Sequence, residues 1–228
     1  MTITRLKWLL VERDSRAGNR WEERPLLSVS ITWGVRRRDA VTSDIPKALD
    51  LSNYKTCEPG DLVINRMRAF QGALGIAPEA GLVSPDYSVL RPVNMVNRSW
   101  LAYVMRSGEF VSEMASVVRG IGGTESGNVR TPRLNVSELG QLTVDLPSLA
   151  EQVAIADFLD RETARIDTLI AKQQQLIETL RERRTSLVNS AVTTGLHKRP
   201  MRDSGDSMLG MVPVDWSIGL GWSSHRVP

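Results

Sequence analysis

The sequence contains little cysteine, few histidines and no long apolar run. Its 228 residues include one cysteine, Cys57, and two histidines. A single cysteine excludes a disulfide framework within the chain and a cysteine-rich zinc cluster, which fits a reducing cytoplasm. No apolar run approaches the roughly 20 residues of a transmembrane helix, and residues 1–16 lack the apolar core and cleavage site of a signal peptide. We therefore expect a soluble cytoplasmic protein without a membrane partner.

The sequence also lacks a catalytic constellation. His197 and His225 lie near the C-terminus, and Cys57 has no histidine near it in the sequence. The glycine-rich stretch 122–128 approaches a phosphate-binding loop, but Asn128 stands where that loop requires lysine, and no apolar strand leads into it. No Asn-Pro-Pro-aromatic tetrapeptide of an adenine methyltransferase is present. We expect a chain that specifies where chemistry occurs, with no catalytic residue, no metal and no cofactor of its own.

Positive charge is modest overall and clustered locally. The net charge of +3 and the isoelectric point near 9.3 do not by themselves identify a nucleic-acid-binding protein. Arginines gather at residues 36–38, 66–68 and 119–133, and the last stretch has four glycines and almost nothing to bury, which predicts a loop. Glycines let backbone amides approach phosphates, while Arg, Asn and Gln side chains bind phosphates or base edges. The candidate DNA contacts are Arg36, Arg37, Arg38, Arg66, Arg68, Gln71, Arg119, Asn128, Arg130 and Arg133.

The same segments have structural interpretations that stay open at this point. Residues 36–38 are equally compatible with a solvated turn, and residues 119–133 with a solvated loop that binds nothing. In the block 65–72, we expect Met67 and Phe70 in the core, which leaves the arginines and Gln71 for a nucleic-acid face.

Residues 1–147 have the pattern of an α+β domain. Short alternating or apolar runs predict strands, and a longer stretch around residues 99–117 predicts a helix. Turn residues separate these elements, for example Glu58-Pro59-Gly60-Asp61. Because strands and helix do not alternate regularly, an α+β fold is favoured over a parallel α/β fold. The predicted strands are 26–31, 61–65, 73–76 and 87–90.

A long helix is predicted after this domain. Pro147 favours an extended conformation for Leu146, Ser148 is a suitable N-cap, and Glu151 completes a capping-box spacing. Gly195 can adopt the left-handed conformation that ends helices. Roughly 45 residues at about 1.5 Å each give a rod on the order of 70 Å, which is too long for the interior of a small domain.

The helix carries apolar residues in a heptad pattern. Seven of its ten a and d positions are apolar, while Glu162, Gln173 and Arg183 interrupt the seam. Such a seam favours a supercoiled partner helix, and buried polar positions set its register. The alternative is an amphipathic helix that lies on its own domain. The predicted pairing residues are Ile155, Leu159, Ile166, Leu169, Gln173, Leu176, Leu180 and Leu187.

Two blocks resemble one known family. Residues 146–195 resemble the conserved helical region of type I restriction-modification specificity subunits, and residues 60–92 resemble the core of one class of their target recognition domains. The resemblance implies a recognition domain at 1–147, a coiled-coil spacer and subunit-docking helix at 148–195, and a segment 196–228 that opens an incomplete second repeat. The helical match includes Leu146, Pro147, Leu149, Glu151, Gln152 and Ile155.

The resemblance also implies partners. We expect the chain to bind double-stranded DNA and methyltransferase subunits, and to meet the restriction subunit through the complex. S-adenosylmethionine and ATP would then be held by those partner subunits.

The chain departs from the family in length. Family members typically carry two recognition domains and two long helices, whereas this chain has one of each. Residues 203–216 resemble the start of a second repeat that does not continue, which suggests a truncated chain or a natural half subunit. Two halves pairing their helices antiparallel would restore a bipartite reader, as a homodimer or with another half. The competing interpretation is a coiled-coil adaptor, a truncated remnant without DNA specificity.

Overall fold

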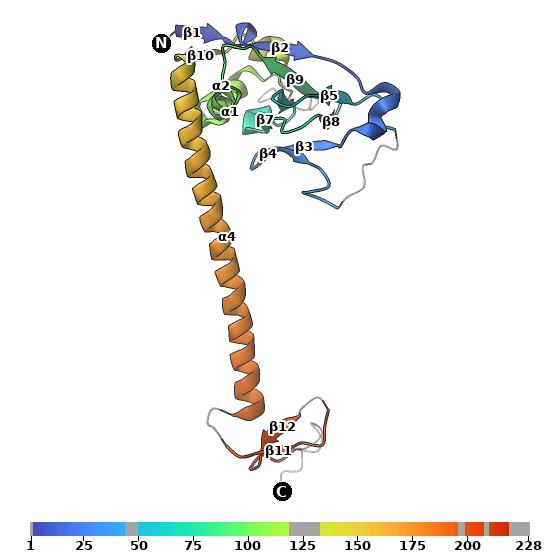
Figure 1. Ribbon diagram of the computed structural model, residues 1–228, viewed down its shortest axis with the longest axis vertical. Coiled ribbons are helices and arrows are strands. Elements are labelled where there is room, and N and C mark those ends of the chain that lie inside the picture. Colours follow the sequence, from blue (N-terminus) through green and yellow to red (C-terminus); the bar gives the residue numbers. More distant parts are fainter. Residues whose placement is uncertain (1, 44–49, 119–132, 196–198, 208–209, 219–228) are drawn as a thin grey trace, which may run out of the picture. The chain divides into compact units, whose positions relative to one another are not determined.

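The computed structural model describes residues 2–43, 50–118, 133–195, 199–207 and 210–218 (Figure 1). The chain forms two compact units, Met1–Asp160 and Arg161–Pro228. No helix among the described residues is both long and apolar enough to cross a membrane. The first unit is β-rich and contains the candidate DNA-contacting residues that the structure describes.

A four-stranded antiparallel sheet organises the first unit. Its central ladder pairs β6 with β9 in a register that places Asn65 opposite Tyr87 and Leu62 opposite Leu90. Three predicted strands, 61–65, 73–76 and 87–90, are therefore confirmed in this one sheet. The strand order is β2 (Leu10–Arg13), β9 (Tyr87–Pro92), β6 (Leu62–Asn65) and β7 (Leu74–Ile76).

Three antiparallel strand pairs complete the β structure of this unit. The predicted strand 26–31 is confirmed as β3, whereas the partners β1, β5, β8 and β10 carry weak alternation and were not predicted. The pairs are β1 (Thr2–Arg5) with β10 (Thr143–Leu146), β3 (Leu27–Ser30) with β4 (Gly34–Arg37), and β5 (Lys55–Cys57) with β8 (Gly81–Val83). Short 3-10 segments lie at Leu6–Trp8, Gly18–Glu23 and Ala69–Gln71.

The predicted helix over 99–117 is two helices, α1 (Arg98–Arg106) and α2 (Gly108–Val117). The break falls at Ser107, whose backbone is extended and whose Oγ accepts a hydrogen bond from Phe110 N at 3.3 Å. Ser107 is thus the N-cap of α2, a role for which serine is well suited. A short helix, α3 (Val136–Leu139), follows in the chain's described part.

The core lies on both sides of β6. Leu62 and Ile64 are buried in a cluster with Trp100, Leu101 and other residues of α1 and α2. These two helices lie side by side in Figure 1. Val63 faces the opposite way, into a second cluster with side chains from β3, β4 and β9. Successive strand residues point to opposite faces, so an apolar run of three residues is buried only where both faces are covered.

The long helix is confirmed as α4 (Leu149–Thr194), 46 residues or about 70 Å. Ser148 Oγ accepts a hydrogen bond from Glu151 N at 3.3 Å, and Gly195 has a φ of 79° in the left-handed region. Both ends therefore lie where the capping residues predicted them. The fold is α+β with a long terminal helix.

In the second unit, β11 (Met201–Asp203) and β12 (Met211–Pro213) form an antiparallel pair. Arg202 Nη2 donates to Trp216 O at 2.7 Å and closes the chain beyond β12 onto this pair.

Candidate nucleic-acid interface

Basic residues from distant parts of the sequence meet around Tyr87, at the first residue of β9. Asn65, the last residue of β6, donates from Nδ2 to Tyr87 Oη at 3.4 Å. Burial raises the pKa of the Tyr87 phenol, and the nearby charges of Arg38 and Arg68 lower it. Two of the predicted DNA contacts, which follow β4 and β6 in sequence, thus lie close to one phenol. We call Arg38, Arg66, Arg68, Tyr87 and Arg133 the Tyr87 cluster.

Arg66 ties this cluster to the segment that begins at Arg133. Its Nε donates to Leu134 O at 2.9 Å and its Nη2 donates to Asn135 Oδ1 at 2.9 Å, while its carbonyl accepts from Leu134 N. Burial lowers the pKa of Arg66, and the positive charge of Arg133 lowers it further. Arg66 is therefore held by the backbone of Leu134 and the side chain of Asn135, with Arg133 nearby.

Arg133 is paired with an acid on its own domain. Its Nη2 lies 2.8 Å from Asp86 Oδ1, and both side chains remain well exposed, at 43% and 57%. An exposed pair of this kind contributes little to stability, so Arg133 can exchange Asp86 for a phosphate at small cost. Arg68, by contrast, is exposed, and no acidic partner is seen for it among the described residues.

The other predicted DNA contacts that the structure describes differ from one another in exposure and in partners. Arg37 forms a two-pronged pair with Glu79, with both N–O distances at 2.7 Å. Arg36 is exposed and lies over the Trp33 ring at 6.0 Å from its centroid, and Arg38 has a buried Nε without a hydrogen-bond partner. Gln71 is exposed at the end of the 3-10 segment Ala69–Gln71.

Two further expectations for this surface can be compared with the structure. Phe70 packs against the main core as expected, but Met67 is 41% exposed, so the expectation that it is a core residue is wrong. The exposed Met67 leaves an apolar side chain between Arg66 and Arg68. The predicted contacts Arg119, Asn128 and Arg130 lie outside the described residues.

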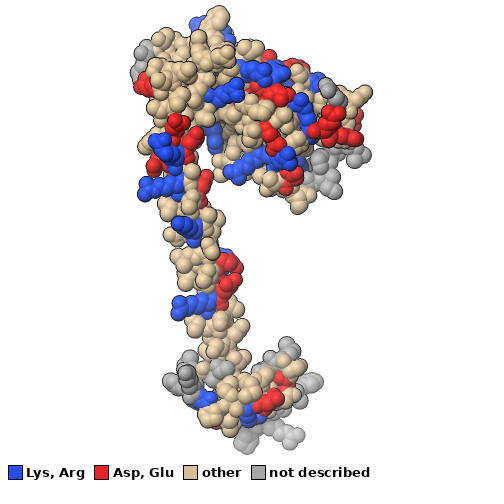
Figure 2. Space-filling view, in the orientation of Figure 1, with Lys and Arg blue, Asp and Glu red and all other residues tan. Residues whose placement is uncertain are grey.

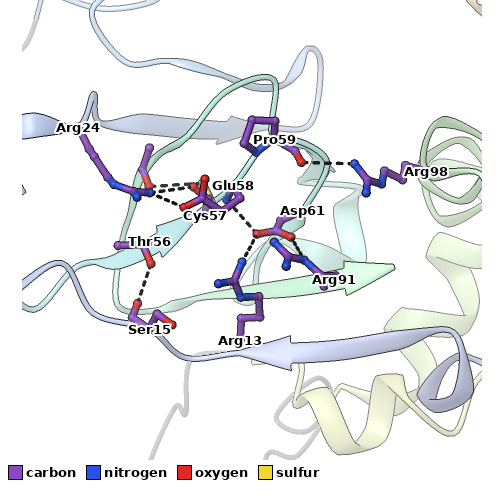
Figure 3. A network of polar contacts seen from close by, with 11 residues as sticks. Arg13, Ser15, Arg24, Thr56, Cys57, Glu58, Pro59, Asp61, Arg91 and Arg98 are labelled. Carbon is purple, nitrogen blue, oxygen red and sulfur yellow. Dashed lines mark hydrogen bonds and ion pairs between the residues drawn. The ribbon is translucent and has the colours of Figure 1, made fainter. Parts of the chain in front are cut away.

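A second polar network, which sequence reasoning did not find, lies at the other end of the β6–β9 ladder (Figure 3). Asp61 is 1% exposed and accepts hydrogen bonds from Arg91 Nε at 3.0 Å, Arg13 Nη1 at 3.4 Å and Glu58 N at 2.9 Å. It therefore joins β2, β9 and the turn that leads into β6.

The turn itself explains the Pro-Gly pair before Asp61. Asp61 N donates to Glu58 O at 3.0 Å, and Gly60 has a φ of 87°, as a turn with proline and then glycine requires. A Cβ at Gly60 would lie 1.8 Å from the Arg98 guanidinium, which donates to Pro59 O. These contacts position the strands that carry the Tyr87 cluster, and they do not themselves form a binding surface.

Seven lysines and arginines of the first unit form ion pairs with aspartate or glutamate among the described residues. In the view of Figure 2, basic and acidic side chains are interspersed over this unit. Because paired arginines are partly neutralised, the Tyr87 cluster, in which Arg38, Arg66 and Arg68 have no ion pair within the described part of the chain, is the stronger candidate for an anionic ligand.

Two possible sources of chemistry within the described residues would be a metal site and the thiol of Cys57. No group of His, Cys, Asp and Glu there could hold a metal ion. Cys57 is fully buried, and desolvation raises the pKa of its thiol to about 11, so a reactive thiolate is disfavoured.

The first turns of α4 are anchored to the first unit by Gln152. This buried side chain accepts from Asn97 N at 2.8 Å and donates to Pro147 O at 3.0 Å. Ala156, one turn later, is buried in the main core. Part of the helix thus lies on its own domain, the alternative that periodicity left open, and this part includes half-buried Leu159.

Farther along, the apolar side chains of α4 are open to solvent. Ile166, Leu169 and Leu180 are each 53% exposed, and Leu176 is 50% exposed. Exposed apolar rows of this kind are typical of surfaces that contact other proteins.

The family model of the type I restriction modification DNA specificity domain matches residues 40–179 of the chain. The chain belongs to this family. The match runs from the segment after β4 across the sheet and into α4, and so it includes Arg66, Arg68, Tyr87 and Arg133.

Three similar proteins are longer than this chain. The specificity subunit of the type I restriction enzyme StySPI of Salmonella potsdam is 24% identical over 187 residues, which cover 77% of this chain and 38% of that protein. A solved chain from a study of complex assembly and conformational transition of the type I R-M system has 19% identity and a TM-score of 0.56, over 83% of this chain and 45% of its own. The HsdS subunit from Thermoanaerobacter tengcongensis has 19% identity and a TM-score of 0.47, over 75% and 39%. The chain spans less than half the length of each.

Proposed function

We propose that this chain is a non-catalytic DNA-recognition subunit that reads one half-site of a bipartite target in a type I restriction-modification system. The observation that carries the proposal is that, in a chain of the DNA specificity family, Arg38 and Arg68 lie near Tyr87, while Arg66 lies near Arg133, which pairs with Asp86, the residue before Tyr87. The four arginines come from three segments of the chain, and among the described residues only Arg133 of the four forms an ion pair, an exposed one with Asp86.

Residues of the Tyr87 cluster would have different roles, some positioning the protein on DNA and others contributing to sequence specificity. Arg68 and Arg133 are exposed and suit phosphate oxygens, which orient a protein on the duplex without reading sequence. Arg66 donates hydrogen bonds to Leu134 and Asn135 of the same chain, so its position on the contact surface is fixed by the protein rather than left to solvent. The remaining predicted contacts, among them Arg36, Arg37, Gln71, Arg119, Asn128 and Arg130, would extend this face.

Residues 1–147 would be the recognition domain, residues 148–195 the spacer and docking helix, and residues 196–228 a linker. Methyltransferase subunits would supply S-adenosylmethionine, and the restriction subunit would supply ATP hydrolysis. Two copies would pair their α4 helices antiparallel, which places one recognition domain at each end and gives a palindromic target.

A map of modified adenines in cells that make this chain and its methyltransferase subunit tests the proposal. A palindromic bipartite motif is the expected result. With a methyltransferase known to be competent, the absence of any motif would contradict the proposal that this chain alone specifies the target.

The alternative is a coiled-coil adaptor for another protein, which the half-exposed apolar row of α4 favours. Salt separates the two functions, because phosphate contacts release counterions and an apolar interface does not. A DNA affinity of the purified chain that falls steeply with salt supports recognition. If the chain does not bind DNA at low salt, but binds a protein partner with an affinity that salt does not change, it is an adaptor.

A further inference from the structure

The exposed apolar side chains of α4 are arranged symmetrically around Gln173. Ile166 and Leu180 lie seven residues before and after it, and Leu169 and Ile177 lie four residues before and after it. Ile170 and Leu176 lie three residues on either side. All six are between 48% and 53% exposed, and all belong to the unit Arg161–Pro228.

These residues share one face of the helix. At about 100° per residue, each of the six lies within about 60° of Gln173 on the helical wheel. The face follows intervals of 11 residues, as in Ile166, Ile177 and Val188, and 11 residues are close to three turns of a straight helix. The heptad register follows this face less closely, because it assigns Arg183 to the seam and omits Ile177.

The same interval places opposite charges at equal distances from Gln173. Glu162 lies 11 residues before it and Arg184 lies 11 residues after it, each within about 20° of the centre of the face. Glu162 has an ion pair on its own helix with Arg165 at 3.9 Å, and both side chains are largely exposed, so that pair holds Glu162 only weakly.

We infer that a second copy of this chain docks on this face antiparallel, with the two-fold axis at Gln173, so that Glu162 of each copy faces Arg184 of the other. This inference rests on the proposed pairing of two copies and adds its register. In that register Gln173 meets Gln173, Ile166 meets Leu180, and Leu169 meets Ile177, so every apolar layer is matched. A parallel pair would place Glu162 against Glu162 and Arg184 against Arg184, which like-charge repulsion disfavours.

The flanks of the face are compatible with this arrangement. Arg165 and Arg183 lie on the same flank, and two-fold pairing brings that flank against its own copy. Arg165 is 74% exposed, so the two arginines can turn into solvent, where water and salt screen their repulsion. The central layers, which become buried, carry the matched residues.

Cysteine cross-linking tests the register in the full chain. Gln173→Cys places two thiols at the axis, and we expect a disulfide-linked dimer under mild oxidation. Leu180→Cys is the matched control, because the two Leu180 positions lie roughly 21 Å apart along the axis. Mixing Ile166→Cys with Leu180→Cys chains should give a cross-linked heterodimer. Native Cys57 is fully buried and should not react.

The outcomes separate the register from the pairing. A self-linked Leu180→Cys dimer would mean parallel helices and would overturn the inference. Dimers in sedimentation without a Gln173→Cys disulfide would overturn the register and leave the pairing in place. A native chain that stays monomeric at all concentrations would remove the proposed homodimer itself, with DNA binding of the single domain measured separately.

A charge exchange gives independent evidence. Glu162→Arg places two arginines opposite each other at two sites of the dimer, and we expect its dimer dissociation constant to rise roughly tenfold or more. Arg184→Glu should have a similar effect, and the double variant should recover to within about threefold of the native value because the pairs are restored in reverse. Circular dichroism reports whether the helix persists. If the double variant dimerises as weakly as the single variants, Glu162 and Arg184 do not pair across the dimer.

Discussion

Replacing Asp61 by alanine should cost the first unit a large part of its stability. The carboxylate is 1% exposed and accepts hydrogen bonds from Arg91, Arg13 and the backbone N–H of Glu58. Its removal leaves two arginines without their acceptor and one turn N–H without a partner. Breaking a buried ion pair by removing one side costs about 3–5 kcal/mol.

The exposure of the two arginines sets the expected value within that range. The side chains of Arg13 and Arg91 are 30% and 46% exposed, so both can recover water as a partner. Glu58 N is less easily satisfied, and an unsatisfied buried group costs about 1–3 kcal/mol. We therefore expect Asp61→Ala to lower the free energy of unfolding by about 3 kcal/mol. Asp61→Asn keeps an acceptor oxygen without the charge, so its loss should be about half as large.

Urea titration followed by tryptophan fluorescence measures this difference, because Trp100 is 3% exposed in the core. The slope of unfolding free energy against urea should be unchanged, so that the shift in midpoint reports stability. Asp86→Ala is the matched control, since it also removes an aspartate from an arginine pair but an exposed one, and it should change stability by less than about 1 kcal/mol. If the Asp61 and Asp86 variants lose equal amounts, burial does not give Asp61 the structural role assigned to it.

Four other results are expected. Arg68→Ala and Arg133→Ala should each weaken DNA binding similarly for all sequences and lower the salt slope by about one in an anisotropy titration, and unchanged slopes would remove them from the phosphate contacts. Gln152→Ala should lower the unfolding free energy by about 1–3 kcal/mol in urea, because Asn97 N loses its acceptor, and a neutral effect would mean that this bond does not anchor α4. Burial raises the pKa of the Cys57 thiol from its ordinary value of 9.0 to about 11, so the unfolded chain loses this proton at a lower pH than the folded chain does. The free energy of unfolding should therefore fall between pH 9 and 11. Urea midpoints measured over this range should fall less in the Cys57→Ala variant. Inserting seven helical residues between the recognition domain and the pairing face should lengthen the spacer in the methylation motif and leave each half-site intact, and altered half-sites would contradict the spacer role of α4.

Local signals in the sequence were enough for β6, β7 and β9 of the main sheet and for α4, whereas the edge strand β2 was not predicted. The runs at 61–65 and 87–90 alternate or stay apolar over strand lengths, and both are strands that pair with each other. The ends of α4 follow from Ser148 and Gly195, because capping is decided by a few neighbouring residues. The helix break at Ser107 was missed, since its apolar periodicity continues across the break and only the cap geometry interrupts it.

The candidate site was predicted in part. Sequence clustering identified the basic groups that contain Arg66, Arg68 and Arg133. The structure places Arg68 near Tyr87 and Arg66 near Arg133, which pairs with Asp86. Tyr87 could not have been singled out, because a lone tyrosine at the start of a strand is ordinary. The exposure of Met67 was also missed, since a hydrophobic residue in a short apolar stretch is assigned to the core when its turn is not recognised.

What the sequence determined by itself were features set by neighbours within a few residues: the ends and length of α4, the strand runs, the turn at Pro59-Gly60, and the symmetric apolar face around Gln173. The tertiary structure alone decided which charges are paired. Asp61 with Arg91, Arg37 with Glu79, and Arg133 with Asp86 are each at least 30 residues apart. Which arginines remain available for DNA depends on those pairings, and a charge carries no local pattern that announces its partner, because the electrostatic interaction depends on distance in space and on burial.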